Sequence, residues 1–230
     1  MNKRLILFQI GSILILPSLG VALLHSEQST TAFFFSILIT AGAGLLLKLF
    51  PPQDRRFGSR EGLVITGLAW ILASLFGALP FYLSAQIPSY IDALFETVSG
   101  FTTTGSTILA NIEVLDQGLL FWRSFTHWIG GMGILVFLLA ILPQNNSHSM
   151  HLMRSEAPGP EVSKFVPRLR DSAKILYQIY ILLTLTMVGC LLFAGMPLFD
   201  SLCTAFGTAG TGGFGIWNDS IALYDSVLIE

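Results

Sequence analysis

Two short segments rich in threonine and glycine hold the residues that could bind an ion. The first is Phe101-Thr-Thr-Thr-Gly-Ser106 and the second is Thr208-Ala-Gly-Thr-Gly-Gly-Phe214. Glycine permits backbone angles that other residues rarely adopt, so such loops can direct successive carbonyl oxygens to one place. In ion channels, carbonyl oxygens of this kind replace the water around a cation. The residue types and their spacing therefore predict cation coordination by the backbone, with threonine hydroxyls as further ligands or as anchors.

Other kinds of site fit these residues less well. Gly210-Thr-Gly-Gly-Phe-Gly215 has the spacing G-x-G-x-x-G of dinucleotide-binding loops, but that motif needs a preceding strand and here it follows an apolar segment. Ser124, His127 and a carboxylate such as Asp116 could form a hydrolase site, although no oxyanion-hole loop lies nearby. A single Thr/Gly segment would best be interpreted as a tight turn between helices. Two such segments in equivalent positions favour ion-binding loops. We expect no enzymatic activity and no cofactor.

The composition is that of a membrane protein. Of the 230 residues, 53% are hydrophobic and 11% are charged, whereas a soluble domain has about 25% charged residues. Five segments are long and apolar enough to cross a hydrocarbon core of about 30 Å, and each should be a helix because a spanning segment must satisfy its own backbone hydrogen bonds. These predicted spans cover residues 5–24, 31–50, 62–84, 118–142 and 172–195.

The charged residues indicate an orientation. Eleven of the twelve Lys and Arg residues flank the same ends of the spans, and the positive-inside rule assigns that side, with the N-terminus, to the cytoplasm. Arg123 is the exception, and we expect it and His127 to bond loop carbonyls or to lie at the membrane interface. Outer loops that simply lack Lys and Arg explain the asymmetry as well as a cation-attracting surface does. That surface would comprise Glu27, Asp92, Glu96, Glu113, Asp116, Asp200, Asp219 and Asp225.

Residues 91–100 and 198–207 are apolar but too short to span. A helix of about ten residues is roughly 15 Å long, which is half a membrane. The predicted spans that neighbour each short segment have their nearer ends on the outer side of the membrane. Each segment should therefore enter the membrane from the outer side and return to it, as a re-entrant half-helix. The Thr/Gly loops at 101–106 and 208–213 would then lie at membrane depth, where irregular backbone must line a watery cavity or be buried in protein.

The two half-helices belong to an internal repeat of span, half-helix, loop and span. Asp92 matches Asp200, and Gly105 matches Gly212 after a one-residue gap. Within the fourth span, Gly130-Gly-Met-Gly133 has the small residues that let another backbone approach closely, and we expect it to pack against a half-helix.

Longer motifs resemble a known family. Phe95-Glu-Thr-Val-Ser-Gly-Phe-Thr-Thr-Thr-Gly-Ser-Thr107 and Phe121-Trp-Arg-Ser-Phe-Thr-His-Trp-Ile-Gly-Gly-Met-Gly133 are similar to segments of the bacterial Trk-type potassium transporters, in the Trk/Ktr/HKT superfamily. The likeness runs along essentially the whole sequence. Shorter similar stretches are Ser59-Arg-Glu-Gly62, Gly77-Ala-Leu-Pro-Phe81 and Arg154-Ser-Glu-Ala-Pro-Gly-Pro160.

The resemblance implies an all-α integral membrane protein of the bacterial plasma membrane with four pore repeats around one pore. This sequence would be the N-terminal half, which ends within the second repeat. Residues 1–58 would form two N-terminal helices, 59–145 the first pore repeat, 146–171 a cytoplasmic connection and 172–230 the incomplete second repeat.

The resemblance also implies the ligands and partners. The potassium ligands would be Thr103, Thr104, Gly105, Gly210, Thr211 and Gly212, with Thr102, Gly213 and Arg123 supporting the loops. A homodimer in the lipid bilayer and a cytoplasmic nucleotide-binding regulatory subunit are expected, with no transition metal and no nucleic acid. Because two loops cannot surround an ion, we expect no conduction by these residues alone. The alternative is a non-conducting truncated membrane protein with a structural or interaction role.

Overall fold

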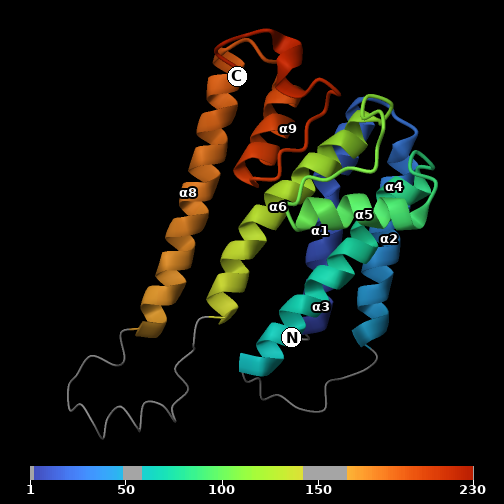
Figure 1. Ribbon diagram of the computed structural model, residues 1–230. Coiled ribbons are helices and arrows are strands. Elements are labelled where there is room, and N and C mark those ends of the chain that lie inside the picture. The colour runs from blue at the N-terminus through green and yellow to red at the C-terminus, as the bar shows by residue number, and fades with distance from the viewer. Residues whose placement is uncertain (1–2, 49–58, 142–164, 230) are drawn as a thin grey trace, which may run out of the picture.

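The computed structural model describes residues 3–48, 59–141 and 165–229, which form helices and no strand. This confirms the all-helical prediction for the described part of the chain. In Figure 1 the long helices run along the bundle, and α5 lies across their direction. The elements are α1 (Lys3–Leu24), α2 (Ser29–Lys48), α3 (Ser59–Gly77), α4 (Leu79–Leu83), α5 (Tyr90–Phe101), α6 (Gln117–Ile141), α8 (Phe165–Phe193), α9 (Leu198–Ala209) and the 3₁₀ helix η2 (Ser220–Tyr224).

The third predicted span is interrupted. Helix α3 ends at Gly77 and the short helix α4 follows, with Pro80 in its first turn. Proline has no amide proton, and its ring clashes with the carbonyl four residues earlier, so the helix cannot continue through it. The carbonyl of Gly77, at the end of α3, accepts a hydrogen bond of 2.9 Å from the indole Nε1 of Trp122. Treating residues 62–84 as one helix overlooked this proline.

Helix α8 begins at Phe165, earlier than the predicted span at residue 172. Part of the predicted cytoplasmic connection is therefore helical. The first turn of a helix tolerates Pro167 because its amide has no partner within the helix in any case. Charged residues such as Arg168 and Arg170 have an ordinary helix propensity, so they do not prevent a helix here.

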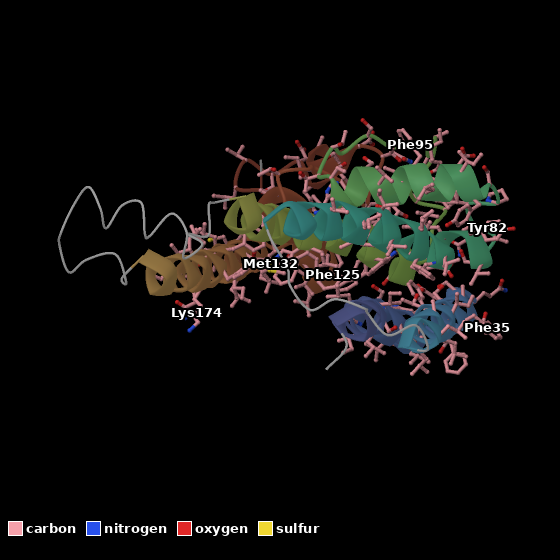
Figure 2. The ribbon with its side chains drawn as sticks, turned by 90° about the horizontal axis from the view of Figure 1, so that it is seen from below. Phe35, Tyr82, Phe95, Phe125, Met132 and Lys174 are labelled. Carbon is pink, nitrogen blue, oxygen red and sulfur yellow. The ribbon has the colours of Figure 1, made fainter. Side chains whose placement is uncertain are left out.

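Apolar side chains cover the outside of several helices. Leu182, Leu183 and Leu185 of α8 are 64%, 62% and 63% exposed, and Phe35 of α2 points outward (Figure 2). Apolar surface of this extent is unusual for a protein in water. Helices α2 and α8 contain stretches long and apolar enough to cross a membrane, Ser29–Leu46 and Lys174–Phe193. The apolar stretches Gly11–Leu24 and Gly67–Leu83 are shorter, and five spans stay a prediction.

A reciprocal exchange of hydrogen bonds joins the α1–α2 pair to α6. Glu27, between α1 and α2, accepts from the first amides of α6, at 2.7 Å from Gln117 N and 2.9 Å from Gly118 N. Asp116, just before α6, accepts from the N–H of Ser29 at the start of α2 at 3.1 Å. Glu27 thus caps the partly positive N-terminus of α6, and Asp116 caps that of α2. This exchange fixes where the N-terminal pair meets the rest of the bundle.

Helix α6 lies between α5 and α9 and packs against both. Trp122 of α6 stacks edge to face against Phe101 of α5, with ring centroids 6.2 Å apart. Phe125 of α6 lies 5.5 Å from Phe206 of α9, and Figure 2 shows Phe125 in the middle of the molecule. Through these contacts one helix positions both of the segments that lead into the Thr/Gly loops.

Candidate functional site

The two short helices before the Thr/Gly loops are built alike. Helices α5 and α9 each have 12 residues and an acidic residue in the first turn, Asp92 and Asp200. In α5 the hydroxyl of Ser89 caps the N-terminus by accepting from Asp92 N, and α9 follows Pro197. An acidic first turn is favoured by the partial positive charge of a helix N-terminus. The opposite ends of both helices, which carry partial negative charge, lead into the loops.

Each loop turns back on its helix through the same hydrogen bonds. The N–H of Thr103 donates to Gly100 O at 3.0 Å, and that of Thr211 donates to Thr208 O at 2.9 Å. Both threonines have positive φ angles, 55° and 60°. The next N–H groups also make equivalent bonds: Thr104 N donates to Ser99 O at 2.9 Å, and Gly212 N donates to Gly207 O at 3.1 Å.

The equivalence of the loops differs by one residue from the sequence prediction. Gly105 has a φ of 76° and Gly213 has a φ of 75°, whereas Gly212 has no positive φ. Gly105 is therefore equivalent to Gly213, and Thr104 to Gly212, with no gap between the repeats. The pairing of Gly105 with Gly212 was wrong because adjacent glycines look alike in a sequence, and only the left-handed backbone distinguishes them.

The loops use their amide groups and leave carbonyl groups unbonded. Within the described residues, the N–H groups of 103, 104, 211, 212 and 213 all donate to the preceding helix. No hydrogen bond between described residues ends on the carbonyl oxygens of 103–105 or 211–213. Backbone N–H groups that point outward can bind anions, but here the N–H groups already donate hydrogen bonds to the preceding helix. The available groups are oxygens, which are ligands for a hard cation.

The first loop has an additional hydroxyl network. The hydroxyl of Thr102 donates to Val98 O at 2.7 Å, and it lies 2.8 Å from the hydroxyl of Thr104. Because the Thr102 hydroxyl donates its single proton to Val98 O, the Thr104 hydroxyl must be the donor in the bond between the two hydroxyls. Thr102 is therefore an anchor of the loop. The equivalent positions in the second loop are Gly210 and Gly212, which have no hydroxyl.

The two loops meet each other and both touch α6. A side chain on Gly105 would overlap the carbonyl oxygen of Gly212, and one on Gly212 would overlap the ring of His127. A Cβ on Gly130 would lie 2.9 Å from the Thr103 methyl, and one on Gly131 would lie 2.9 Å from Gly210 Cα. The glycines of α6 thus receive both loops, as well as the end of α5. The expected close packing of this motif is confirmed and extends to the second loop.

Arg123 and His127 lie one turn apart on α6 and contact the second loop. Arg123 is 2% exposed and donates from Nη1 to Gly215 O at 2.7 Å, with its guanidinium 3.6 Å from the ring centre of Phe214. The imidazole of His127 stacks on the same ring at 3.9 Å, and its Nδ1 accepts from Phe214 N at 3.4 Å. Arg123 bonds the carbonyl of Gly215, just after the loop, and its role in supporting the loops stays a prediction. His127 accepts a hydrogen bond from the loop instead of bonding a carbonyl.

Several acidic residues that the sequence assigned to an outer, cation-attracting surface are engaged inside the protein. Glu96 is 1% exposed and pairs with Arg123, with Nε and Oε1 2.5 Å apart. Asp200 is 8% exposed and accepts hydrogen bonds from Trp217 and Tyr224. Glu27 caps α6, as described above. The sequence could not separate buried from exposed carboxylates, because their partners lie far away along the chain.

The alternative sites do not form. The motif Gly210–Gly215 follows helix α9, and no strand precedes it in the described part of the chain. Asp116 is engaged with Ser29 N and His127 with Phe214 N, so neither orients the other toward Ser124. No group of three or more potential metal ligands occurs among the described His, Cys, Asp and Glu residues.

Known proteins are similar to this chain in sequence. A family model described as TrkH, a cation transport protein, matches residues 25–230. The Trk system potassium uptake protein TrkH of Halomonas elongata is 39% identical over 239 residues, which cover 100% of this chain and 50% of the relative. The Trk system potassium uptake protein TrkG of Escherichia coli is 37% identical, covering 95% of this chain and 46% of the relative.

A solved structure is also similar. The crystal structure of the potassium transporter TrkH from Vibrio parahaemolyticus has a TM-score of 0.75 and 31% sequence identity, covering 100% of this chain and 47% of that one. The chain therefore spans about half the length of the curated relatives and of the solved structure that it matches. The family model describes a transport protein rather than an enzyme, in agreement with the sequence analysis.

Proposed function

The chain belongs to the TrkH family of cation transport proteins, and on that premise we propose that it serves potassium uptake by supplying two loops of a cation filter. The loop residues are Thr103, Thr104 and Gly105 in the first repeat. In the second repeat we extend the predicted Gly210, Thr211 and Gly212 to Gly213, the equivalent of Gly105. Carbonyl oxygens at these positions would replace the water shell of potassium.

The observation that carries this proposal is the unequal use of the two backbone groups. Both loops bond their N–H groups back to the half-helix and leave their carbonyl oxygens without a hydrogen bond from any described residue. Helices α5 and α9 add partial negative charge at their C-terminal ends, next to the same loops. Both effects favour a cation over an anion.

We further propose that the chain crosses the bacterial plasma membrane several times, with its N-terminus in the cytoplasm. In Figure 1 the N-terminus and the beginnings of α3 and α8 lie at one end of the bundle, and the C-terminus lies at the other. Nearly all Lys and Arg residues flank the first of these ends. The relatives are named as parts of a Trk system, which supports a further component as a partner. We propose that this component is a cytoplasmic nucleotide-binding regulatory subunit and that the transport protein is a homodimer.

The alternative, a non-conducting structural role, is supported by the share of the relatives that the chain spans. Two loops do not surround an ion that needs coordination from all sides. We therefore expect these 230 residues alone to insert and fold without conducting. A protein of the relatives' full length that contains these residues, called the complete protein below, should conduct.

Rubidium uptake into liposomes tests both statements. The complete protein should take up rubidium in competition with potassium and should restore growth of an uptake-deficient strain at micromolar potassium. The 230-residue chain should do neither. Uptake by that chain alone would contradict the two-loop account, and no uptake by the complete protein would contradict the transport function itself.

A further inference from the structure

Glu96 and Arg123 form a buried ion pair between two units, α5 with the first loop and α9 with the second loop. The side chains are 0% and 2% exposed, and Arg123 Nε lies 2.5 Å from Glu96 Oε1. Removing two charges from water costs several kcal/mol per ion, so such a pair persists only where further hydrogen bonds satisfy it. Charged residues at membrane depth are therefore strong candidates for a functional role.

On one side, the pair holds the segment that leaves the first loop. The carboxylate of Glu96 accepts from the hydroxyl of Thr107 at 2.9 and 3.0 Å and from the N–H of Ile108 at 3.0 Å. Glu96 itself belongs to α5, the half-helix that enters this loop. One carboxylate thus ties together the beginning and the end of the first loop, on either side of its free carbonyls.

On the other side, the pair holds the segment that leaves the second loop. Arg123 Nη1 donates to Gly215 O at 2.7 Å, and the guanidinium lies 3.6 Å from the centre of the Phe214 ring. A guanidinium is a planar fork, so Nε can serve Glu96 while Nη1 serves the carbonyl. The attraction of the cation to the ring adds to this contact.

The pair is a feature of the first unit and is not repeated in the second. With the equivalence established by the backbone, the position of Glu96 in α5 corresponds to Thr204 in α9. Among the described residues, the two half-helix-and-loop units are therefore joined by one ion pair. Glu96 also neutralises Arg123, whose uncompensated charge beside the second loop would repel a passing cation.

We propose that Glu96 and Arg123 are positioning residues that fix the distance between the two loops and thereby the selectivity among monovalent cations. The selectivity part rests on the proposed filter function, whereas the distance part does not. Ligand cages discriminate between ions only when their supporting residues hold the ligands in place. Here the ion pair is the buried connection from one loop exit to the other. Farther along the chain, Asn218 makes exposed hydrogen bonds with Asn111, Ile112 and Glu113.

The distance between the loops is measured with spin labels on the complete protein. Labels at Ser106→Cys and Asp219→Cys lie on exposed positions after each loop, in a Cys190→Ser background that removes the exposed native thiol. The variants are Arg123→Gln and Glu96→Gln, and the second keeps the test open if the first does not fold. The matched control is Glu27→Gln, which also neutralises a carboxylate that accepts backbone N–H groups, but which bonds Gln117 and Gly118 at the start of α6 rather than either loop exit.

We expect the distance distribution to broaden in both variants and to stay narrow in the Glu27→Gln control. In the same samples, the ratio of rubidium to sodium uptake should fall at least tenfold in both variants and remain unchanged in the control. An unchanged distribution in a folded variant overturns the positioning role. A broadened distribution with an unchanged ratio overturns the selectivity role. If the unsubstituted protein transports no cation, the filter function fails, while the distance distribution still decides the positioning role.

Discussion

The carbonyl oxygen of Gly212 occupies the space into which a side chain on Gly105 would project. Gly105 also has a φ of 76°, a conformation that residues with a Cβ rarely adopt. Two independent constraints therefore require glycine at this position, and one of them comes from the other repeat. The close approach of the two loops depends on the absence of a single methyl group.

Replacing Gly105 with alanine should abolish uptake more severely than the same change at Gly213. Gly213 has nearly the same φ, 75°, but open space where its side chain would be. Alanine there should cost only the left-handed strain of about 1–2 kcal/mol. At Gly105 the overlap adds a shift of the loop that costs a further 1–3 kcal/mol or so. Rubidium uptake by the two variants in liposomes measures the difference, and equal losses would contradict the contact between the loops.

Alanine at Gly130 or Gly131 should displace the loops from α6. A Cβ at Gly130 would meet the Phe101 carbonyl, and one at Gly131 would lie 2.6 Å from the hydroxyl of Tyr180. Each change should lower stability by about 1–3 kcal/mol, as overpacking does in a close-packed interior. Gly189 of α8 is the control, because nothing lies within 4 Å of its missing side chain. Alanine favours a helix by about 1 kcal/mol over glycine, so Gly189→Ala should leave melting in detergent unchanged or raise it.

The sequence predicted the elements better than the connections between them. Apolar segments of sufficient length identified the long helices, and segments of half that length identified α5 and α9. The break at Pro80 was readable from the sequence and was overlooked. The pairing of Glu96 with Arg123 was not readable, because nothing local to either residue specifies a partner so distant in the chain. The equivalence of Gly105 with Gly213 required the φ angles, since neighbouring glycines are interchangeable in a sequence comparison.

Removing the carboxylate of Glu27 should loosen the N-terminal helix pair. Glu27 accepts from Gln117 N and Gly118 N at the start of α6. Loss of a helix cap costs about 1 kcal/mol, and up to roughly 2 where the cap is charged and partly buried. Glu27→Ala should therefore lower the melting temperature in detergent. Gln28→Ala, at the exposed neighbouring residue, should not. Equal melting of the two variants would show that the capping exchange contributes nothing.

Tyr224 should titrate well above an ordinary tyrosine. Burial, followed by its hydrogen bond to Asp200, raises the pKa of Tyr224 from 10.0 to about 12. Because the fold favours the neutral phenol, its contribution to stability is complete below pH 10 or so and is lost as the pH approaches 12. The ultraviolet difference between the protein and its Tyr224→Phe variant should therefore show phenolate formation near pH 12. A midpoint near pH 10 would contradict the buried contact with Asp200.

The most direct test of the filter is to locate the ion. Crystals of the complete protein grown in rubidium should show anomalous scattering beside the carbonyl oxygens of residues 103–105 and 211–213. The peaks should disappear when sodium replaces rubidium and should weaken in the Gly105→Ala variant. Anomalous peaks elsewhere, with none within coordination distance of these carbonyls, would contradict the assignment of the two loops as the cation filter.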